Sequence, residues 1–202
     1  MQNRFIDACL RVGVKEQAAG ALWLAVEQKY TEAQRHYHNL THIEKMLAAL
    51  DESGQGTDTI ELAIWFHDVV YEPMEACNEA DSACFFEQHL GGLVSGAVAE
   101  SVSRLILATD PRRQRSGRAD EDLLIDIDLN ILGSSRREYG QYSKAIREEY
   151  RQVAEDDFIA GRRAVLEGFL SQPIYATVFF SKLESSARNN LQQELNELEK
   201  RG

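Results

Sequence analysis

The chain has 202 residues, of which 44% are hydrophobic and 27% are charged, a balance typical of one globular domain with a sizeable core. Its formal net charge of −11 argues against duplex DNA or RNA as a main partner, because an acidic surface repels phosphate backbones. The three cysteines form no CxxC pair, the N-terminus has no apolar signal segment, and no apolar run is long enough to cross a membrane. We therefore expect a cytoplasmic protein with no disulfide framework and no membrane partner.

Between the breaks in the hydrophobic pattern, the sequence has helical character throughout. The three prolines fall at these breaks, and apolar residues recur near a 3.6-residue period in segments such as 93–108. Residues 174–180 (IYATVFF) are strand-like in composition but have no obvious partner, so helix or loop is expected there. The sequence predicts an all-α fold, with a single domain over residues 1–202. The expected helices cover residues 4–12, 15–29, 31–52, 58–72, 78–91, 93–108, 120–132, 135–152, 155–171 and 182–200.

The expected helix over 31–52 contains three of the five histidines, in the run RHYHNLTHIEKML. His38 and His42 are four residues apart and would share one helix face. His38 and Asn39 are candidates to orient a ligand from this run. His36 is expected on the surface.

The next helix carries a His-Asp pair inside the apolar run ELAIWFHDVVYEP. An ionised Asp68 beside His67 would be costly to bury unpaired, so either a divalent cation or a buried hydrogen-bond donor must compensate. Glu72 follows one turn later and is either a general acid or base or a helix-end carboxylate. Asn78 and Glu79 begin the following helix and either help position water and protons or simply cap that helix.

A basic loop at 111–118 stands out in an acidic chain. It either clamps a substrate phosphate through bidentate hydrogen bonds or is a solvated surface loop. Its arginines are Arg112, Arg113, Arg115 and Arg118.

The segment DLLIDIDLNILG places Asp126 and Asp128 among leucines and isoleucines. Two carboxylates in an apolar helix indicate that at least one of them faces a cation. The segment 120–132 starts with an acidic turn and stops at Gly133, as expected of a helix.

The order His, then His-Asp, then Asp resembles the HD superfamily of metal-dependent phosphohydrolases. The segments YHNLTHI, FHDVVYEP, NEADSA, IDIDLNILG and the tail IREEY…GRRAVLEGFL…IY…ARNNL resemble a bacterial branch of that superfamily, from about residue 20 to 195. The resemblance implies a single HD-type helical domain around a central metal site. It also implies the ligands His42, His67, Asp68 and Asp128, with Asp126 as a rival for the last position.

One metal ion is expected rather than two. Some HD proteins bind a second ion through two further histidines, but this chain has Asp110-Pro111-Arg112 where relatives often carry one, and His89 has the pattern of a surface residue. Two imidazoles and two carboxylates suit one divalent ion, such as Mn²⁺, Co²⁺, Ni²⁺, Fe²⁺, Zn²⁺ or Mg²⁺. Water on such an ion becomes a nucleophile near neutral pH.

These features predict hydrolysis of a phosphate ester, in a nucleotide or another small phosphorylated substrate. Asp68, Glu72 and Glu79 are the expected catalytic residues. One alternative is a non-catalytic metal- or ligand-binding module used for sensing, and another is a plain helical interaction protein. The sequence leaves a homo-oligomer open.

Overall fold

Helices make up all the regular secondary structure in residues 1–201, the part of the chain that the computed structural model describes. The all-α expectation is confirmed; Gly202, the last position of the expected domain, lies outside the described residues. No helix between residues 1 and 201 is both long and apolar enough to cross a membrane. The α-helices are α1 (Gln2–Arg11), α2 (Glu16–Tyr30), α3 (Leu40–Ser53), α4 (Asp58–Phe66), α5 (Asn78–His89), α6 (Gly96–Ala108), α7 (Ala119–Asp128), α8 (Arg136–Glu149), α9 (Glu155–Leu170), α10 (Val178–Ser181) and α11 (Glu184–Glu199), and the short 3₁₀ helices are η1 (Gly91–Leu93) and η2 (Leu129–Gly133).

Side-chain caps fix where several helices begin. The Asn39 side chain accepts a hydrogen bond from a backbone N–H of the first turn of α3 at 2.9 Å, and Ser135 caps α8 in a reciprocal capping box with Glu138. Helix α3 ends at Gly54, whose φ of 64° lies in the left-handed region that favours glycine. These local signals place His42 in the first turn of α3.

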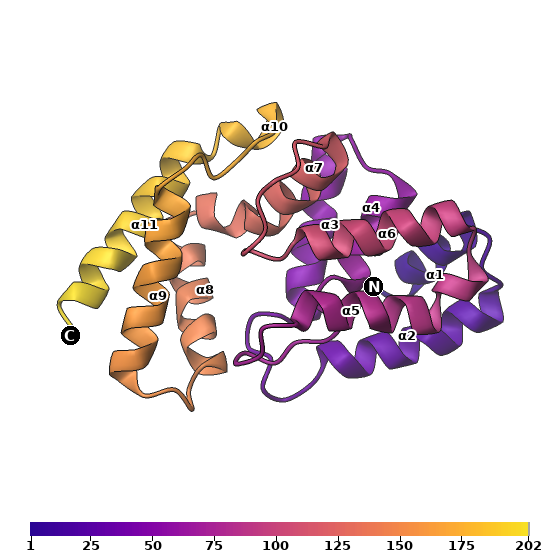
Figure 1. Cartoon of the computed structure of the whole chain (residues 1–202), viewed down its shortest axis with the longest axis horizontal. Coiled ribbons are helices and arrows are strands. Elements are labelled where there is room, and N and C mark those ends of the chain that lie inside the picture. Colours follow the sequence, from indigo (N-terminus) through magenta and orange to yellow (C-terminus); the bar gives the residue numbers. More distant parts are fainter. Residues whose placement is uncertain (202) are drawn as a thin grey trace.

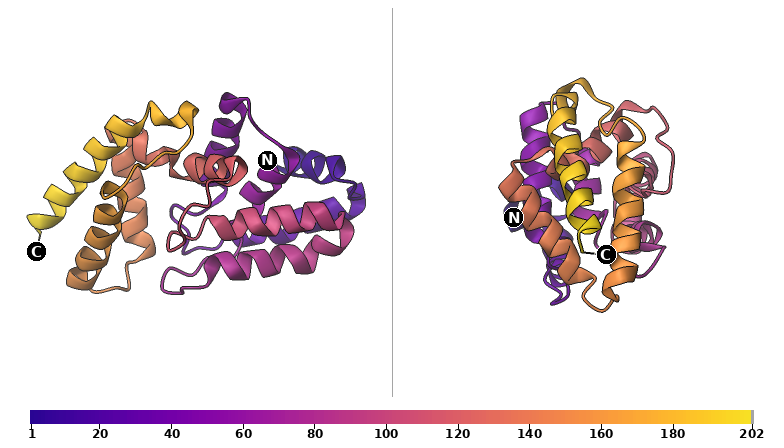
Figure 2. Two further views of the ribbon diagram at one scale, coloured as in Figure 1. Left: turned by 45° about the horizontal axis from the view of Figure 1, so that its top comes forward. Right: turned by 90° about the vertical axis from the view of Figure 1, so that its left-hand side faces the viewer.

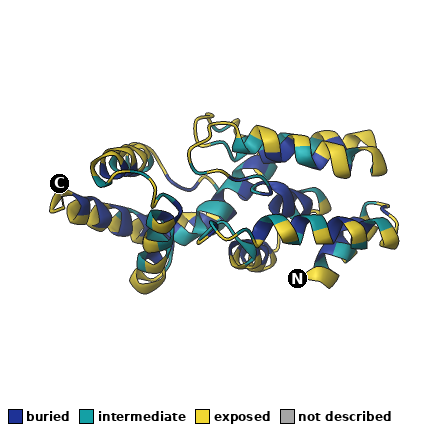
Figure 3. Ribbon diagram, turned by 90° about the horizontal axis from the view of Figure 1, so that it is seen from below, coloured by how far each residue is buried: buried dark blue, intermediate teal, exposed yellow. Residues whose placement is uncertain are grey.

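An aromatic cluster packs α1, α2 and α4 together. The ring of Trp65 meets those of Phe5 and Trp23 edge to face, with centroids 5.4 and 5.9 Å apart. Both tryptophans are buried, and Figure 3 shows that the buried faces of the helices turn inward. Edge-to-face pairs contribute about 0.5–1.5 kcal/mol each beyond their burial. The cluster therefore holds α4 firmly, and α4 leads directly into His67.

Helices α8, α9 and α11 lie side by side at one end of the molecule, away from α1 and α2 (Figures 1 and 2). A buried ion pair joins them: Arg162 of α9 donates to both carboxylate oxygens of Glu194 of α11, at 2.9 and 3.1 Å. Tyr139 of α8 donates to the same carboxylate. A buried pair is favourable only when its remaining polar atoms are also bonded, and this network meets that condition.

The link between this end and the rest of the molecule is η2, directly after Asp128. Asn190 of α11 donates to the carbonyls of Leu132 and Ser134 at 2.9 and 3.0 Å. A Cβ at Gly133 would lie only 2.7 Å from the Cβ of Leu183, so the close approach requires glycine. These contacts fix the backbone on the far side of Asp128.

Two expected helices differ most from the prediction. The helix expected over 31–52 begins only at Leu40, and the helix expected over 58–72 ends at Phe66. The buried side chain of Arg35 explains both differences, because it donates to the carbonyls of Asp68 at 2.6 Å and Val69 at 3.0 Å. These bonds hold the segment before α3 as a loop across the end of α4.

The strand-like stretch over 174–180 is loop followed by the short helix α10, as expected for helix or loop. Its loop part returns to α7, where it meets Asp126.

Candidate metal centre

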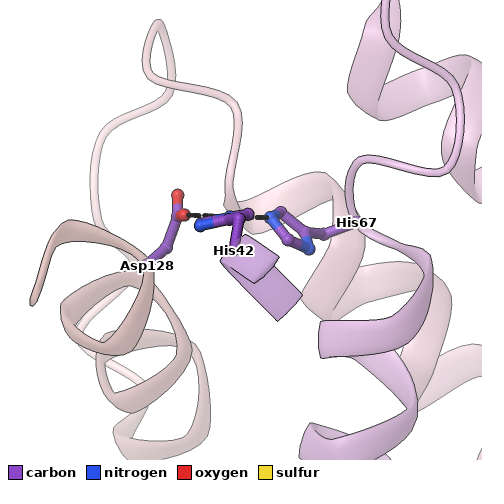
Figure 4. Close-up of side chains that lie close together, drawn as sticks. All are labelled: His42, His67 and Asp128. Carbon is purple, nitrogen blue, oxygen red and sulfur yellow. Dashed lines mark hydrogen bonds and ion pairs between the residues drawn. The ribbon is translucent and has the colours of Figure 1, made fainter. Parts of the chain in front are cut away.

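Three segments that are distant in sequence bring four ionisable side chains to one point. His42 comes from the first turn of α3, His67 and Asp68 follow directly on α4, and Asp128 is the last residue of α7. In Figure 4, His42 lies between Asp128 and His67, and all three side chains point toward one another. Because Asp68 lies beyond the end of α4, it can share this point with the preceding histidine.

The distances among these side chains fit ligands of a single ion. The Nε2 atoms of His42 and His67 are 3.3 Å apart, and Asp128 Oδ1 is 3.2 Å from the first and 3.8 Å from the second. Asp68 Oδ2 is 3.0 Å from His67 Nε2 and 3.7 Å from His42 Nε2. Two ligands held about 2.1 Å from one ion at ordinary coordination angles are about 3.0–3.4 Å apart. One ligand atom from each of His42, His67 and Asp128 lies within 4.8 Å of the others, so these three side chains fit a divalent metal, whereas Asp68 lies near the two histidines but outside this group.

A hydrogen bond at Nδ1 of His67 leaves its Nε2 atom available as a metal ligand. Its Nδ1 lies 3.0 Å from the carbonyl oxygen of Ile64, which can only accept a hydrogen bond. The Nδ1 atom therefore carries a proton and donates it, and in the neutral ring Nε2 is left with its lone pair facing the cluster. Both ligand histidines are buried, whereas the side chains of Asp68 and Asp128 are 14% and 27% exposed.

The charges at this point are strongly coupled. Burial lowers the pKa of His67, but the carboxylates of Asp68 and Asp128 outweigh it and raise that pKa above its ordinary value. Burial raises the pKa of Asp68, but the neighbouring histidines, His67 foremost, bring it well below its usual range. For His42, burial dominates and lowers the pKa. Two carboxylates beside buried imidazoles thus form a site that favours positive charge, supplied by protons or by a cation.

The structure separates the two rival aspartates. Asp128 lies in the cluster, whereas Asp126 is fully buried and points the other way. The carboxylate of Asp126 accepts hydrogen bonds from Arg115 at 2.7 Å and from the backbone N–H of Thr177 at 2.7 Å. It also accepts from the N–H of Ala176 at 3.1 Å. Asp126 is therefore a structural anchor for the loop before α10.

Glu79 is near enough to the cluster for the charge of Asp68 to act on its pKa. The Glu79 side chain is 19% exposed, and Arg112 approaches it to 4.0 Å. Burial raises the pKa of Glu79, and the charges of Asp110 and Asp68 add to the increase.

Glu72 is exposed, and within residues 1–201 its carboxylate has no hydrogen-bond or ion-pair partner. The prediction that Glu72 lies one helical turn after Asp68 is wrong, because α4 ends at Phe66, before both residues.

Asn78 closes the loop before α5. Its side chain accepts from the backbone N–H of Glu72 and donates to the carbonyl of the same residue, both at 2.9 Å. This is a local structural role at the start of α5. His36 and His89 are exposed, as expected.

The basic loop is mostly tied to its own neighbours. Arg115 bonds to Asp126, and Arg118 lies 3.6 Å from the carboxylates of Asp120 and Glu121. Arg112 is bonded to Asp110 at 2.8 Å while its side chain stays 58% exposed. The loop therefore does not present its four arginines together as a phosphate clamp.

Glu149 lies in the motif IREEY, and no pattern in the sequence assigns it a role. This buried carboxylate of α8 lies 2.7 Å from His38 Nδ1 and accepts from the backbone N–H of His38 at 2.9 Å. Burial lowers the pKa of His38, but this bond raises it to a net value above normal. His38 also stacks on Tyr71, with ring centroids 4.0 Å apart. His38 thus shares no helix with His42, and it fixes the loop that precedes the ligand.

No protein-family model, curated protein or solved structure matches the chain. Its function must therefore be argued from the chemistry of the centre itself.

Proposed function

We propose that the chain is a metal-dependent phosphohydrolase of the HD type that holds one divalent ion through His42, His67, Asp68 and Asp128. The observation that carries the proposal is the convergence of two imidazole nitrogens and two carboxylates, 3.0–3.8 Å apart in the neighbouring pairs. Such a mixed nitrogen and oxygen set suits Mn²⁺, Co²⁺, Ni²⁺, Fe²⁺ or Zn²⁺, and Mg²⁺ less well. When bound, the ion would supply Lewis acidity and a water of lowered pKa.

The side chains around the centre have distinct parts in this reaction. The bond from His67 Nδ1 to Ile64 keeps the Nε2 lone pair aimed inward. Asp68 and Asp128, which are partly exposed, mark the side from which substrate enters. Glu79 has a raised pKa, so it can hold a proton and pass it through a water to the departing alcohol oxygen.

Loading the protein with each divalent metal and assaying a panel of phosphate esters for phosphate release tests this function directly. At least one ester is expected to be turned over. Stoichiometric metal binding with no turnover of any ester would instead support the binding-module alternative.

Metal removal is expected to lower the melting temperature by about 5–10 °C. An ion present at about 100 times its Kd stabilises the folded state by about 2.7 kcal/mol, and a chain of this size shifts by about 2–4 °C per kcal/mol. Differential scanning calorimetry before and after chelation, with metal content checked by elemental analysis, measures the shift. An identical melting curve after verified removal contradicts a metal site that is coupled to the fold.

Glu79→Gln is expected to reduce kcat by about 10²-fold, the lower end for acid–base assistance, because Glu79 acts through a water. Metal stoichiometry should not change. The matched control is Glu72→Gln, which alters an exposed carboxylate seven positions earlier and should leave kcat unchanged. Equal effects of the two substitutions would remove Glu79 from the reaction.

A further inference from the structure

A pocket of about 190 Å³ adjoins the candidate metal centre. His42 and Asp128 form part of its wall, so whatever occupies it lies next to the proposed ion. The other walls come from the loop before α3, from α3, from the end of α7, from η2 and from the start of α8. His67 and Asp68 do not line it, so the pocket extends to one side of the centre.

The pocket is lined by both apolar and polar side chains. Met46, Ala49 and Ile127 are buried apolar residues of its wall. Lys45 and Asn130 are among its polar residues, and within residues 1–201 neither side chain has a hydrogen-bond or ion-pair partner. Lys45 and the wall residue Glu52 are exposed, so both are open to a polar ligand.

The volume sets the size of that ligand. Pockets that enclose drug-sized molecules are about 300–1,000 Å³, so this one is smaller than a pocket that would enclose a whole nucleoside. It also offers no free aromatic face on which a base could stack. Tyr37 is the aromatic residue in the wall besides His42, and its ring already packs against those of Tyr142 and His42, with centroids 4.7 and 4.9 Å away.

One lysine and three carboxylates line the pocket, so a phosphate would be held by the proposed ion together with Lys45, and the rest of the wall suits hydroxyl groups rather than a second anionic group. Lys45 is the only cation in the wall and follows His42 by three residues, so it lies on the same face of α3. Its ammonium can therefore donate to a phosphate oxygen at the metal. Glu52, Asn130 and the free oxygen of Glu138 are acceptors suited to sugar hydroxyl groups.

We propose that this pocket binds the alcohol part of a small hydroxylated phosphomonoester, a sugar or polyol phosphate, rather than a nucleotide. The inference rests on the proposed phosphohydrolase function and deepens it. In the reaction, a water oxygen bonds to phosphorus, the bond from phosphorus to the sugar oxygen breaks, and a proton returns to that oxygen. The products are inorganic phosphate and the free sugar, and the balance needs no oxidant or reductant.

The test compares ribose 5-phosphate, glycerol 3-phosphate and adenosine monophosphate on protein loaded with Mn²⁺. The sugar and polyol phosphates are expected to have kcat/KM values at least about tenfold above that of the nucleotide, because the pocket accepts the sugar but not the base. Lys45→Ala should raise KM for ribose 5-phosphate about tenfold with little change in kcat, as expected for loss of a charge-assisted bond. Lys15→Ala, which removes another exposed lysine before α2, is the matched control and should change neither constant.

Ala49→Leu separates the pocket from the metal. The larger side chain fills the pocket, so KM for ribose 5-phosphate should rise while the inhibition constant of inorganic phosphate stays unchanged. Saturation-transfer NMR with the non-hydrolysable phosphonate analogue of glycerol 3-phosphate gives a readout that does not depend on turnover. Its signal should weaken in Ala49→Leu and persist in the Lys15→Ala control.

The possible results distinguish the two proposals. Preference for adenosine monophosphate, or an Ala49→Leu variant with unchanged KM and NMR signal, overturns the pocket assignment while the phosphohydrolase function stands. Turnover of no ester overturns the function, and the phosphonate signal then decides whether the pocket still binds a polyol phosphate.

Discussion

Asp126→Ala is expected to lower the free energy of unfolding by about 3 kcal/mol, although Asp126 lies only two positions from a proposed metal ligand. The carboxylate is fully buried and accepts bonds from Arg115 and from the backbone and hydroxyl of Thr177. Alanine leaves these donors without their acceptor. Because Arg115 is 26% exposed and can recover some hydration, we expect the lower end of the 3–5 kcal/mol range typical of a broken buried pair.

Urea denaturation followed by circular dichroism measures this loss. The matched control is Asp122→Ala, on the same helix and against the same arginine, since Asp122 Oδ1 lies 3.3 Å from Arg115. That pair is partly exposed and bears none of the backbone contacts, so its loss should cost less than about 1 kcal/mol. A loss for Asp126→Ala no larger than that of the control would show that the loop before α10 does not depend on this carboxylate.

The grouping of the four side chains could be predicted because each is an ionisable residue in an apolar segment. Such a residue must find a partner when it is buried, and the resemblance to HD phosphohydrolases indicated which ones meet. The resemblance favoured Asp128 as the last ligand, but the sequence left Asp126 as a rival. The partners of Asp126 include Thr177, which lies fifty-one positions later in the chain, and local patterning says nothing about that contact.

The same reason explains the helix boundaries that differed. Residues 31–39 have helical composition, but the side chain of Arg35 binds carbonyl groups thirty-three and thirty-four positions away. Those tertiary bonds outweigh a weak local preference for helix. The caps at Asn39 and Ser135, by contrast, are contacts between near neighbours, and such ends can be predicted from sequence.

The basic loop shows the limit of charge patterning. Its four arginines read as one cluster in the sequence, yet Arg115 and Arg118 bind carboxylates of α7 and support the fold. Arg112 alone among them approaches Glu79. A run of like charges therefore indicated neither which side chains are free nor which direction each one faces.

Asp128→Ala is expected to abolish stoichiometric metal binding and to reduce kcat/KM by at least about 10³-fold. The ion's electrostatic contribution to phosphoryl transfer is worth several kcal/mol, and each 1.36 kcal/mol corresponds to a factor of ten. The metal-free stability should change little, because the side chain is 27% exposed and no backbone group depends on it. This outcome is the reverse of that for Asp126→Ala, which should lose stability but still bind one ion when folded.

Elemental analysis after metal loading and dialysis gives the stoichiometry, and initial rates on the best ester give kcat/KM. Asp122→Ala again serves as the control on α7, because it changes a carboxylate of the same helix without touching the centre. Asp128→Glu adds a further comparison, because glutamate keeps the carboxylate but displaces it by one methylene. This variant should recover part of the metal binding and a smaller part of kcat/KM. If Asp128→Ala keeps one ion per chain and turns over ester at the original rate, Asp128 is not a ligand, and His42, His67 and Asp68 must hold the ion alone.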